Sequence, residues 1–148
     1  MAHRVLIING PNLNRLGSRE PEIYGTLSYA ELETAVAERA SELNLDVDIR
    51  QSNSESEIIG WLHLAADSQL PVIMNPAAFT HYSYAIADAC AMLSAPLVEV
   101  HISNPGAREE FRQHSVITPF ATGVIAGFGV DSYLLALQSL ARLLLSKA

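Results

Sequence analysis

The feature of this sequence that most constrains its fold is the regular alternation of short apolar runs with amphipathic helical segments. Apolar and β-branched residues predict five strands, at residues 4–9, 45–51, 71–75, 97–101 and 119–126. Helical patterns lie between most of these strands, and a further helix closes the chain. A strand–helix alternation of this kind predicts βαβ units built around a parallel sheet.

Capping residues mark the start of two of the helices. Ser28 with Glu31, and Ser54 with Glu57, have the spacing of a capping box, in which both side chains bond backbone N–H groups at a helix start. Each box precedes apolar residues at helical spacing. A third helix is predicted over residues 81–93, and the last contains residues 137–144.

Five strands in a chain of 148 residues indicate a flavodoxin-like, doubly wound α/β sheet. The expected strand order is 2-1-3-4-5, with helices on both faces in a three-layer αβα arrangement. No linker or repeat interrupts the sequence, so residues 1–148 are predicted to form a single domain. In such sheets ligands bind beyond the carboxyl ends of the strands, near the switch point between the first and third strands.

The composition argues against several classes of partner and cofactor. Sixteen acidic side chains against nine basic ones give a formal net charge of −7 at pH 7. Such a chain is poorly suited to nucleic acid or anionic membranes, because both attractions depend on basic residues. A single cysteine, Cys90, excludes an internal disulfide, and no His, Asp or Glu group has convincing metal-ligand spacing. We therefore expect no metal or cofactor. With no signal peptide or membrane span predicted, we expect a cytoplasmic protein.

Polar side chains follow three of the predicted strands, at residues 9–17 (NGPNLNRLG), 75–81 (NPAAFTH) and 101–104 (HISN). Because the carboxyl ends of parallel strands share one edge of the sheet, these loops are expected to converge on one site. None of them contains a GxGxxG or GxxxxGKS/T phosphate loop, and the chain has no GxSxG nucleophile elbow. A module that binds a phosphate-bearing cofactor is therefore the weaker alternative to an enzyme.

The segment at residues 17–25 (GSREPEIYG) has the composition of a lid. Glycines bracket it and could act as hinges over the strand ends. It contains Arg19 and Tyr24. A phenol has an ordinary pKa of about 10, so a tyrosine that acts as a base near neutral pH needs a neighbouring cation. Arg19 could supply that charge without competing for the proton.

Three further pairs of residues have spacings that suggest a site. His101 ends an apolar strand with Glu99 on the same face, where a carboxylate could fix the tautomer of a general acid. Arg108 and Arg112 are placed on one helical face, where two guanidinium groups would suit a carboxylate ligand. His81 and Asp88 are likewise expected on one side of a helix.

Together these segments resemble the type II 3-dehydroquinases (3-dehydroquinate dehydratases). The likeness covers nearly the whole chain and is carried by INGPNLNRLGSREPEIYG, RQSNSESEIIGWLH, NPAAFTHYSYAIADA, EVHISNPGAREEFRQHS and GFGVDSYLLAL. It implies a flavodoxin-like fold and the anti elimination of water from 3-dehydroquinate, giving 3-dehydroshikimate. That reaction serves either aromatic amino-acid biosynthesis or quinate breakdown.

The resemblance also implies roles for individual residues. Tyr24 would remove a proton α to the substrate ketone, helped by Arg19, and Asn12 would stabilise the enolate through an ordered water. His101, oriented by Glu99, would protonate the departing hydroxyl. Residues in the positions that hold the substrate are Asn75, His81, Ile102, Ser103 and Arg112. Asp88 would reach the site of a neighbouring subunit, since members of the family are dodecamers built from four trimers.

Another, unrelated dehydroquinase type uses a lysine Schiff base, which this chain is not equipped to form. Its only lysine is Lys147, next to the last residue. The enolate is therefore expected to be non-covalent.

Three positions depart from the family pattern, since Ala77, Gly106 and Ser132 stand where Gly, His and Gly are frequent. A methyl group at Ala77 could tighten the site or reject a positive φ. A catalytically inactive binding homologue is the remaining alternative, disfavoured by intact Tyr24, Arg19 and His101.

Overall fold

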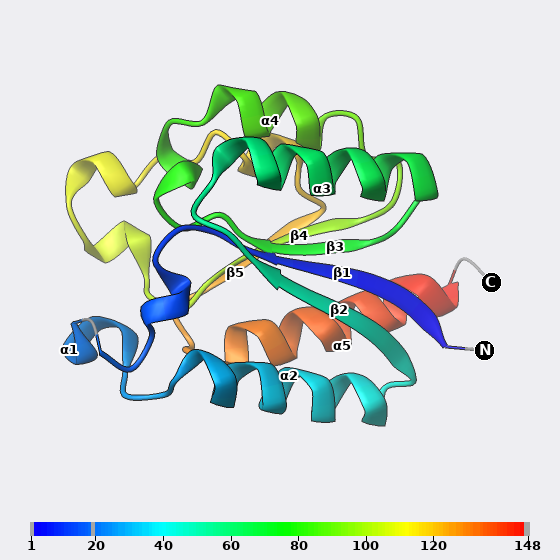
Figure 1. Cartoon of the computed structure of the whole chain (residues 1–148), viewed down its shortest axis with the longest axis horizontal. Helices are drawn as coiled ribbons and strands as arrows, with labels where there is room; N and C mark the ends of the chain where they lie inside the picture. Colours follow the sequence, from blue (N-terminus) through cyan, green and yellow to red (C-terminus); the bar gives the residue numbers. More distant parts are fainter. Residues whose placement is uncertain (1, 19, 147–148) are drawn as a thin grey trace.

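Five parallel strands form one sheet in the computed structural model, within the residues that it describes, 2–18 and 20–146 (Figure 1). The strands are β1 (His3–Asn9), β2 (Leu45–Gln51), β3 (Val72–Asn75), β4 (Leu97–His101) and β5 (Gly123–Ala126). Their order is β2-β1-β3-β4-β5, and each neighbouring pair is parallel. The predicted α/β class and strand order are therefore confirmed.

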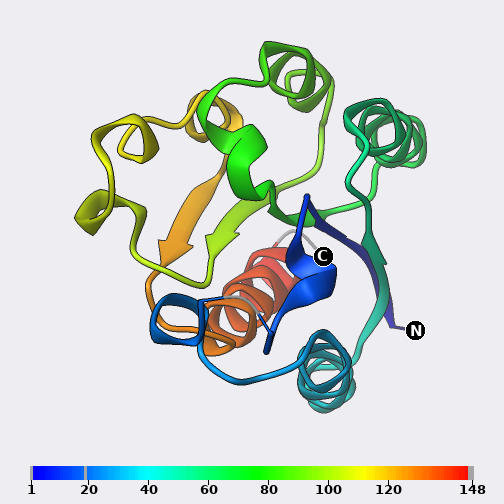
Figure 2. The same ribbon diagram turned by 60° about the vertical axis from the view of Figure 1, so that its left-hand side comes forward.

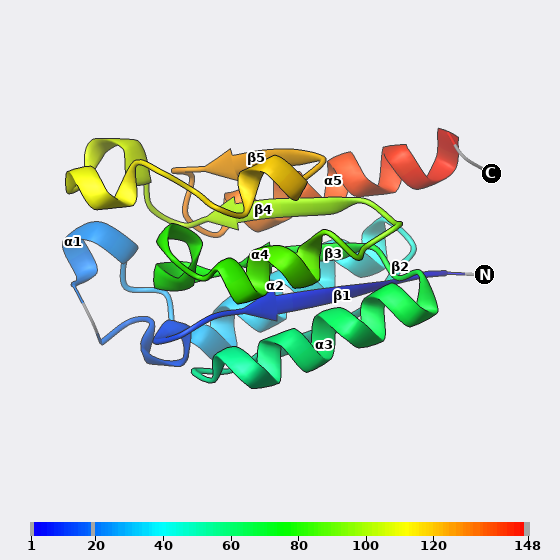
Figure 3. The same ribbon diagram turned by 90° about the horizontal axis from the view of Figure 1, so that it is seen from above.

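Helices cover both faces of the sheet (Figures 1 and 3). α2 (Tyr29–Glu42) and α5 (Asp131–Ser146) lie on one face, and α3 (Glu55–Ser68) and α4 (Tyr84–Cys90) lie on the other. The short helix α1 (Pro21–Tyr24) lies beyond the carboxyl ends of the strands. Among the described residues, no helix is long and apolar enough to cross a membrane.

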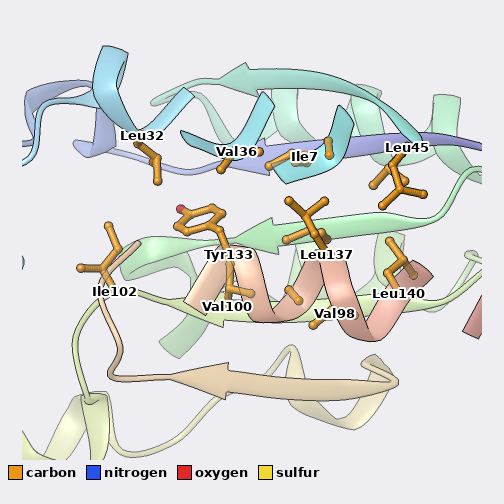
Figure 4. Packing of buried hydrophobic residues seen from close by; sticks show 14 of the residues in the cluster. Ile7, Leu32, Val36, Leu45, Val98, Val100, Ile102, Tyr133, Leu137 and Leu140 are labelled. Atoms are coloured by element: carbon orange, nitrogen blue, oxygen red, sulfur yellow. The ribbon is translucent and has the colours of Figure 1, made fainter. Parts of the chain in front are cut away.

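The burial of β1 explains its uninterrupted apolar sequence. Val5 and Ile7 belong to the cluster under α2 and α5, whereas Leu6 and Ile8 belong to the cluster under α3 and α4. Successive side chains of a strand point to opposite faces, so a strand covered on both faces needs apolar residues at every position. Figure 4 shows the first cluster, with Ile7 from the sheet facing side chains of the two helices.

Two predicted elements differ from the structure by more than one residue at an end. The helix expected over residues 81–93 is a 3₁₀-helix, Ala77–His81, followed by α4. The backbone leaves the helical conformation at Tyr82 (φ −152°, ψ −9°), and the Ser83 side chain caps a new helix at Ile86 N–H. His81 and Asp88 therefore do not share a helix, contrary to the prediction. The fifth strand begins at Gly123 rather than residue 119, since Pro119 lies in a 3₁₀-helix.

Loops from two neighbouring strands pack backbone against backbone at the carboxyl edge, which is turned forward in Figure 2. Gly10 follows β1, and its N–H donates to the Asn75 carbonyl of β3 at 2.8 Å. A Cβ at Gly10 would lie 2.5 Å from the carbonyl oxygen of Pro76. Only glycine permits this approach, so Gly10 sets the spacing between the two loops beside the site.

Candidate active site

A cavity lies at the switch point of the sheet, beyond the carboxyl ends of β1, β3 and β4. These are the loops predicted from the sequence to converge, and most of the predicted site residues line this cavity. They are Asn12, Tyr24, Asn75, His81, His101, Ile102, Ser103 and Arg112. Arg19 lies outside the described residues. The remaining two, Glu99 and Asp88, do not line this cavity.

The loop after β1 is held in place by side chains from the end of β2. Asn12 has a φ of 71°, a left-handed conformation that asparagine tolerates well. Its backbone N–H donates to Asn53 Oδ1 at 2.9 Å, and Gln51 Nε2 donates to the Gly10 carbonyl and to Asn53 Oδ1, both at 3.1 Å. Gln51 and Asn53 were not predicted as site residues, although they lie within the segment RQSNSES that carries the family resemblance.

The loop after β3 begins with Asn75, whose side chain is bonded on both sides. Its Oδ1 accepts the Ala77 N–H at 3.1 Å, and its Nδ2 donates to the Tyr133 hydroxyl at 3.0 Å. Ala77 has a φ of 53°, so the chain adopts the left-handed conformation here despite the alanine methyl group. Tyr133, on α5, was not predicted as part of the site.

His101 and Glu99 form a buried pair at the end of β4. His101 Nε2 lies 2.6 Å from Glu99 Oε2, and the two side chains share a face of the strand as predicted. Glu99 is 1% exposed. Its carboxylate also accepts hydrogen bonds from the hydroxyls of Thr118, at 2.8 Å, and Ser115, at 3.2 Å.

The environment of Glu99 keeps it ionised. Burial alone would raise the pKa of this carboxyl group. The hydrogen bond and positive charge of His101, with the hydroxyls of Thr118 and Ser115, outweigh burial and hold the pKa of Glu99 below its ordinary value. Glu99 is therefore a carboxylate at neutral pH, and the bond to His101 Nε2 leaves Nδ1 as the other ring nitrogen available for proton transfer.

Tyr24 stands on α1, under the side chain of Arg108. The Cζ atom of Arg108 lies 5.2 Å from the centroid of the Tyr24 ring. Arg108 Nη1 also donates to Ser103 Oγ at 3.3 Å, whereas its Nε is buried without a hydrogen-bond partner among the described residues. A guanidinium stays charged at any physiological pH, so Arg108 places a fixed positive charge beside the Tyr24 ring.

The prediction that Arg108 and Arg112 share a helical face is wrong. Arg108 follows the 3₁₀-helix Pro105–Ala107, and Arg112 ends a separate one, Glu110–Arg112. Two short turns replace one helix, because Arg108 itself has an extended backbone. Both guanidinium groups still line the cavity, and Arg112 Nε bonds to the Glu109 carboxylate.

His81 faces the cavity as a neutral ring. Its Nδ1 lies 2.9 Å from the His114 carbonyl, which can only accept, so Nδ1 carries the proton and Nε2 has a free lone pair. Burial lowers the pKa of His81, and the charges of His101 and Arg112 lower it further against the opposing effect of the His114 carbonyl. His81 can therefore accept a hydrogen bond from a hydroxyl ligand.

Asp88 lies outside the cavity of its own chain. It is exposed on α4 and does not contribute to the cavity lining.

Cys90 lies on the same helix and is buried, which raises the pKa of its thiol to about 12. It is therefore a protonated core residue. The described residues contain no group of three His, Cys, Asp or Glu side chains arranged to hold a metal ion.

Comparison with known proteins points to one family. The model of the class II dehydroquinase family matches residues 3–141. A 3-dehydroquinate dehydratase of Salinispora tropica is 59% identical over 138 residues, 93% of this chain and 96% of the relative. One from Mycobacterium tuberculosis is 56% identical over 138 residues, 93% of this chain and 94% of the relative.

Similarity to solved structures agrees with the sequence comparison. The crystal structure of a type II dehydroquinase from Propionibacterium acnes is 54% identical and has a TM-score of 0.94, covering 96% of this chain and 98% of that one. The family match, the relatives and the solved structure all lead to the same assignment. The chain belongs to the class II dehydroquinase family.

Proposed function

We propose that this protein catalyses the dehydration of 3-dehydroquinate to 3-dehydroshikimate by an anti elimination through an enolate. The observation that carries the proposal is that one cavity joins a tyrosine under a guanidinium, Tyr24, to a carboxylate-paired histidine, His101. These two side chains supply the base and the acid that the loss of water needs. The relatives described above are named for this reaction.

The first step removes a proton from the carbon next to the ketone. Ionised Tyr24 takes this proton, and the electrons of the C–H bond move into a carbon–carbon double bond as the ketone oxygen becomes negative. Arg108 places a fixed positive charge over the ring of this base, and we expect Arg19 to assist the base as the family resemblance implies. We expect Asn12 to stabilise the enolate through an ordered water, since a developing oxyanion requires pre-positioned hydrogen-bond donors.

The second step expels the hydroxyl group. The enolate electrons return to re-form the ketone, the new double bond forms within the ring, and the C–O bond breaks. His101 gives its proton to the departing oxygen, so the leaving group is water. Glu99 stabilises the charged imidazolium before this transfer. The 2.6 Å contact between Glu99 Oε2 and His101 Nε2 also fixes the orientation of the ring.

The remaining predicted residues hold the substrate. Arg112 supplies a fixed positive charge for the carboxylate, and the neutral His81 offers an acceptor to a hydroxyl. The other three, Asn75, Ile102 and Ser103, line the same cavity.

The reaction belongs to aromatic amino-acid biosynthesis or to quinate catabolism, two routes that share it. We assign the enzyme to the cytoplasm.

We further propose that the protein assembles as a homo-oligomer, a dodecamer of four trimers. Asp88 is exposed on α4 away from its own cavity, so its role requires a neighbouring subunit. Large apolar side chains near it are also exposed, namely Tyr84 at 72% and Met92 at 58%. Light scattering of the purified protein should give the mass of a trimer or dodecamer, and a fully active monomer would contradict this assembly.

The activity is tested by following the enone absorbance of the product after 3-dehydroquinate is added. We expect the wild-type protein to produce a steady rise, and His101→Gln to slow it by about 10²-fold or more, as for the loss of a general acid. His63→Gln is the matched control, because His63 is exposed on α3. A wild-type protein that leaves 3-dehydroquinate unchanged would overturn the proposed function.

A further inference from the structure

The phenol of Tyr133 links α5 to the loop that begins with Asn75 after β3. Tyr133 is fully buried in the cluster between α5 and the sheet, where Figure 4 shows its ring among apolar side chains. Its hydroxyl donates to Asn9 Oδ1 at 2.6 Å and accepts from Asn75 Nδ2 at 3.0 Å. Asn9 ends β1 and Asn75 ends β3, so this one hydroxyl joins the two strands at the switch point.

The direction of every proton in this chain of hydrogen bonds is determined by one backbone group. The Ala77 N–H can only donate, so it fixes Oδ1 as the Asn75 atom that faces it. Nδ2 of Asn75 must then face Tyr133, whose hydroxyl proton must point to Asn9. Nδ2 of Asn9 in turn donates to the Tyr29 hydroxyl at 3.3 Å. The network therefore has a single consistent orientation.

Tyr133 keeps its proton throughout the physiological range. Burial raises the pKa of Tyr133, and the hydrogen bond from Asn75 offsets this only in part. A neutral phenol can donate and accept at once, whereas a phenolate could not donate to Asn9. Both bonds therefore persist together.

The backbone of Asn75 is already fixed by the sheet, since its carbonyl accepts the Gly10 N–H at 2.8 Å. The orientation of its side-chain amide is a separate matter, because an amide can rotate by 180° and exchange its oxygen and nitrogen. Contacts to Ala77 and Tyr133 exclude that exchange and still leave one N–H and one lone pair of the amide unused. Asn75 lines the cavity, so these remaining groups are available to a ligand.

We infer that Tyr133 is a positioning residue for substrate binding, which holds the Asn75 amide in the orientation that meets the substrate. This inference rests on the proposed function, because it takes 3-dehydroquinate as the ligand of Asn75. Tyr133 acts through Asn75 and takes no part in proton transfer. Its removal should therefore weaken substrate binding and leave the chemical step largely intact.

The test uses four proteins in the full-length chain: wild type, Tyr133→Phe, Asn75→Ala and the double variant. Tyr133→Phe preserves the ring and removes only the hydroxyl. We expect it to raise KM for 3-dehydroquinate roughly five- to tenfold, the range that one neutral hydrogen bond supports, with kcat within about twofold of wild type. In the Asn75→Ala background, the same substitution should raise KM by less than about twofold, because the contact it acts through is gone.

Tyr29→Phe is the matched control. It removes a hydroxyl from the far end of the same network, where the contact is with Asn9 and not with Asn75. We expect its KM to stay within about twofold of wild type. Asn9→Ala is a second probe, since it removes the acceptor of the Tyr133 proton and lets the hydroxyl turn toward Asn75. It should raise KM in the same direction, and it stands in for Tyr133→Phe should that protein fail to fold.

The outcomes separate this inference from the proposed function. A wild-type protein inactive on 3-dehydroquinate defeats the function itself. An active wild type with an unchanged KM in Tyr133→Phe overturns the positioning role, as does an equal rise of KM with and without Asn75. A purely structural role for Tyr133 would lower the melting temperature without this dependence on Asn75.

Discussion

The guanidinium carbon of Arg108 lies 5.2 Å from the centroid of the Tyr24 ring, and both side chains line the same cavity. Arg108 reaches this position from the segment after β4, whereas Tyr24 belongs to α1 near the start of the chain. Helix α1 and the loop after β4 are thereby joined at the proposed base.

Replacement of Tyr24 by phenylalanine tests the proposed base. The change removes only a hydroxyl from a half-buried ring, so the fold should be preserved. We expect kcat to fall by about 10²–10⁴-fold, the usual contribution of a general base. Tyr82→Phe, a change at an exposed tyrosine, is the control for the same chemistry. Near-normal turnover by Tyr24→Phe in a steady-state assay would exclude Tyr24 as the base.

Arg108→Gln tests the charge over the Tyr24 ring. The variant keeps a polar side chain but removes the fixed positive charge beside the proposed base. We expect kcat to fall by at least about tenfold, as for other losses of a fixed charge beside a developing or resident anion. Arg142→Gln, at an exposed position on α5, should retain wild-type kinetics. Equal activity of the two variants would show that Arg108 does not support Tyr24.

The depressed pKa of Glu99 predicts a pH dependence of stability. A carboxyl group whose pKa is lower in the folded state stabilises the protein above its unfolded pKa of about 4.3, and this contribution disappears as pH falls through the folded value. We expect Glu99→Gln to lower the free energy of unfolding by about 1–3 kcal/mol at pH 7. The difference from wild type should shrink below about pH 4.3.

Urea unfolding of Glu99→Gln and wild type between pH 7 and pH 3 measures this difference. Glu38→Gln, at an exposed position on α2, serves as the matched carboxylate substitution. A loss of stability in Glu99→Gln that stays constant over the whole pH range would mean that the ionised form of Glu99 is not what stabilises the fold.

The left-handed conformation of Ala77 predicts a stabilising substitution. Ala77 has a φ of 53°, where an alanine is strained by about 1–2 kcal/mol and glycine is not. After the entropic penalty of glycine, Ala77→Gly should raise the free energy of unfolding by about 0.5–1 kcal/mol. Ala85→Gly, at an exposed position in α4, should instead destabilise the protein. Thermal melting compares the two, and a lower melting temperature for Ala77→Gly would contradict the strain.

A non-covalent enolate predicts resistance to borohydride. Imine formation requires an amine, and the only lysine of the chain is Lys147, outside the described residues. Borohydride added together with 3-dehydroquinate should leave activity unchanged, and mass spectrometry should find no adduct. Activity should also survive a chelator. An adduct on Lys147 that grows as activity falls would establish a Schiff-base mechanism instead.

The sequence alone determined the architecture, because periodicity and caps are local properties. The apolar run of β1 is explained by burial on both faces, and the capping box of Ser28 and Glu31 starts α2 as predicted. The pairing of Glu99 with His101 also follows from strand geometry, since alternate residues share a face. The convergence of the loops at one edge follows from the parallel order of the strands.

The tertiary structure decided the contacts between distant segments, because no local pattern specifies which side chains meet when elements pack. Tyr133 bonds to Asn9 across 124 positions of sequence and to Asn75 across 58. Arg108 was predicted to share a helical face with Arg112, yet an extended backbone at Arg108 separates them and places its side chain over Tyr24. The polar residues at the strand ends could therefore be read from the sequence, whereas the contacts between distant segments depended on how α1, α5 and the loop after β4 pack around the sheet.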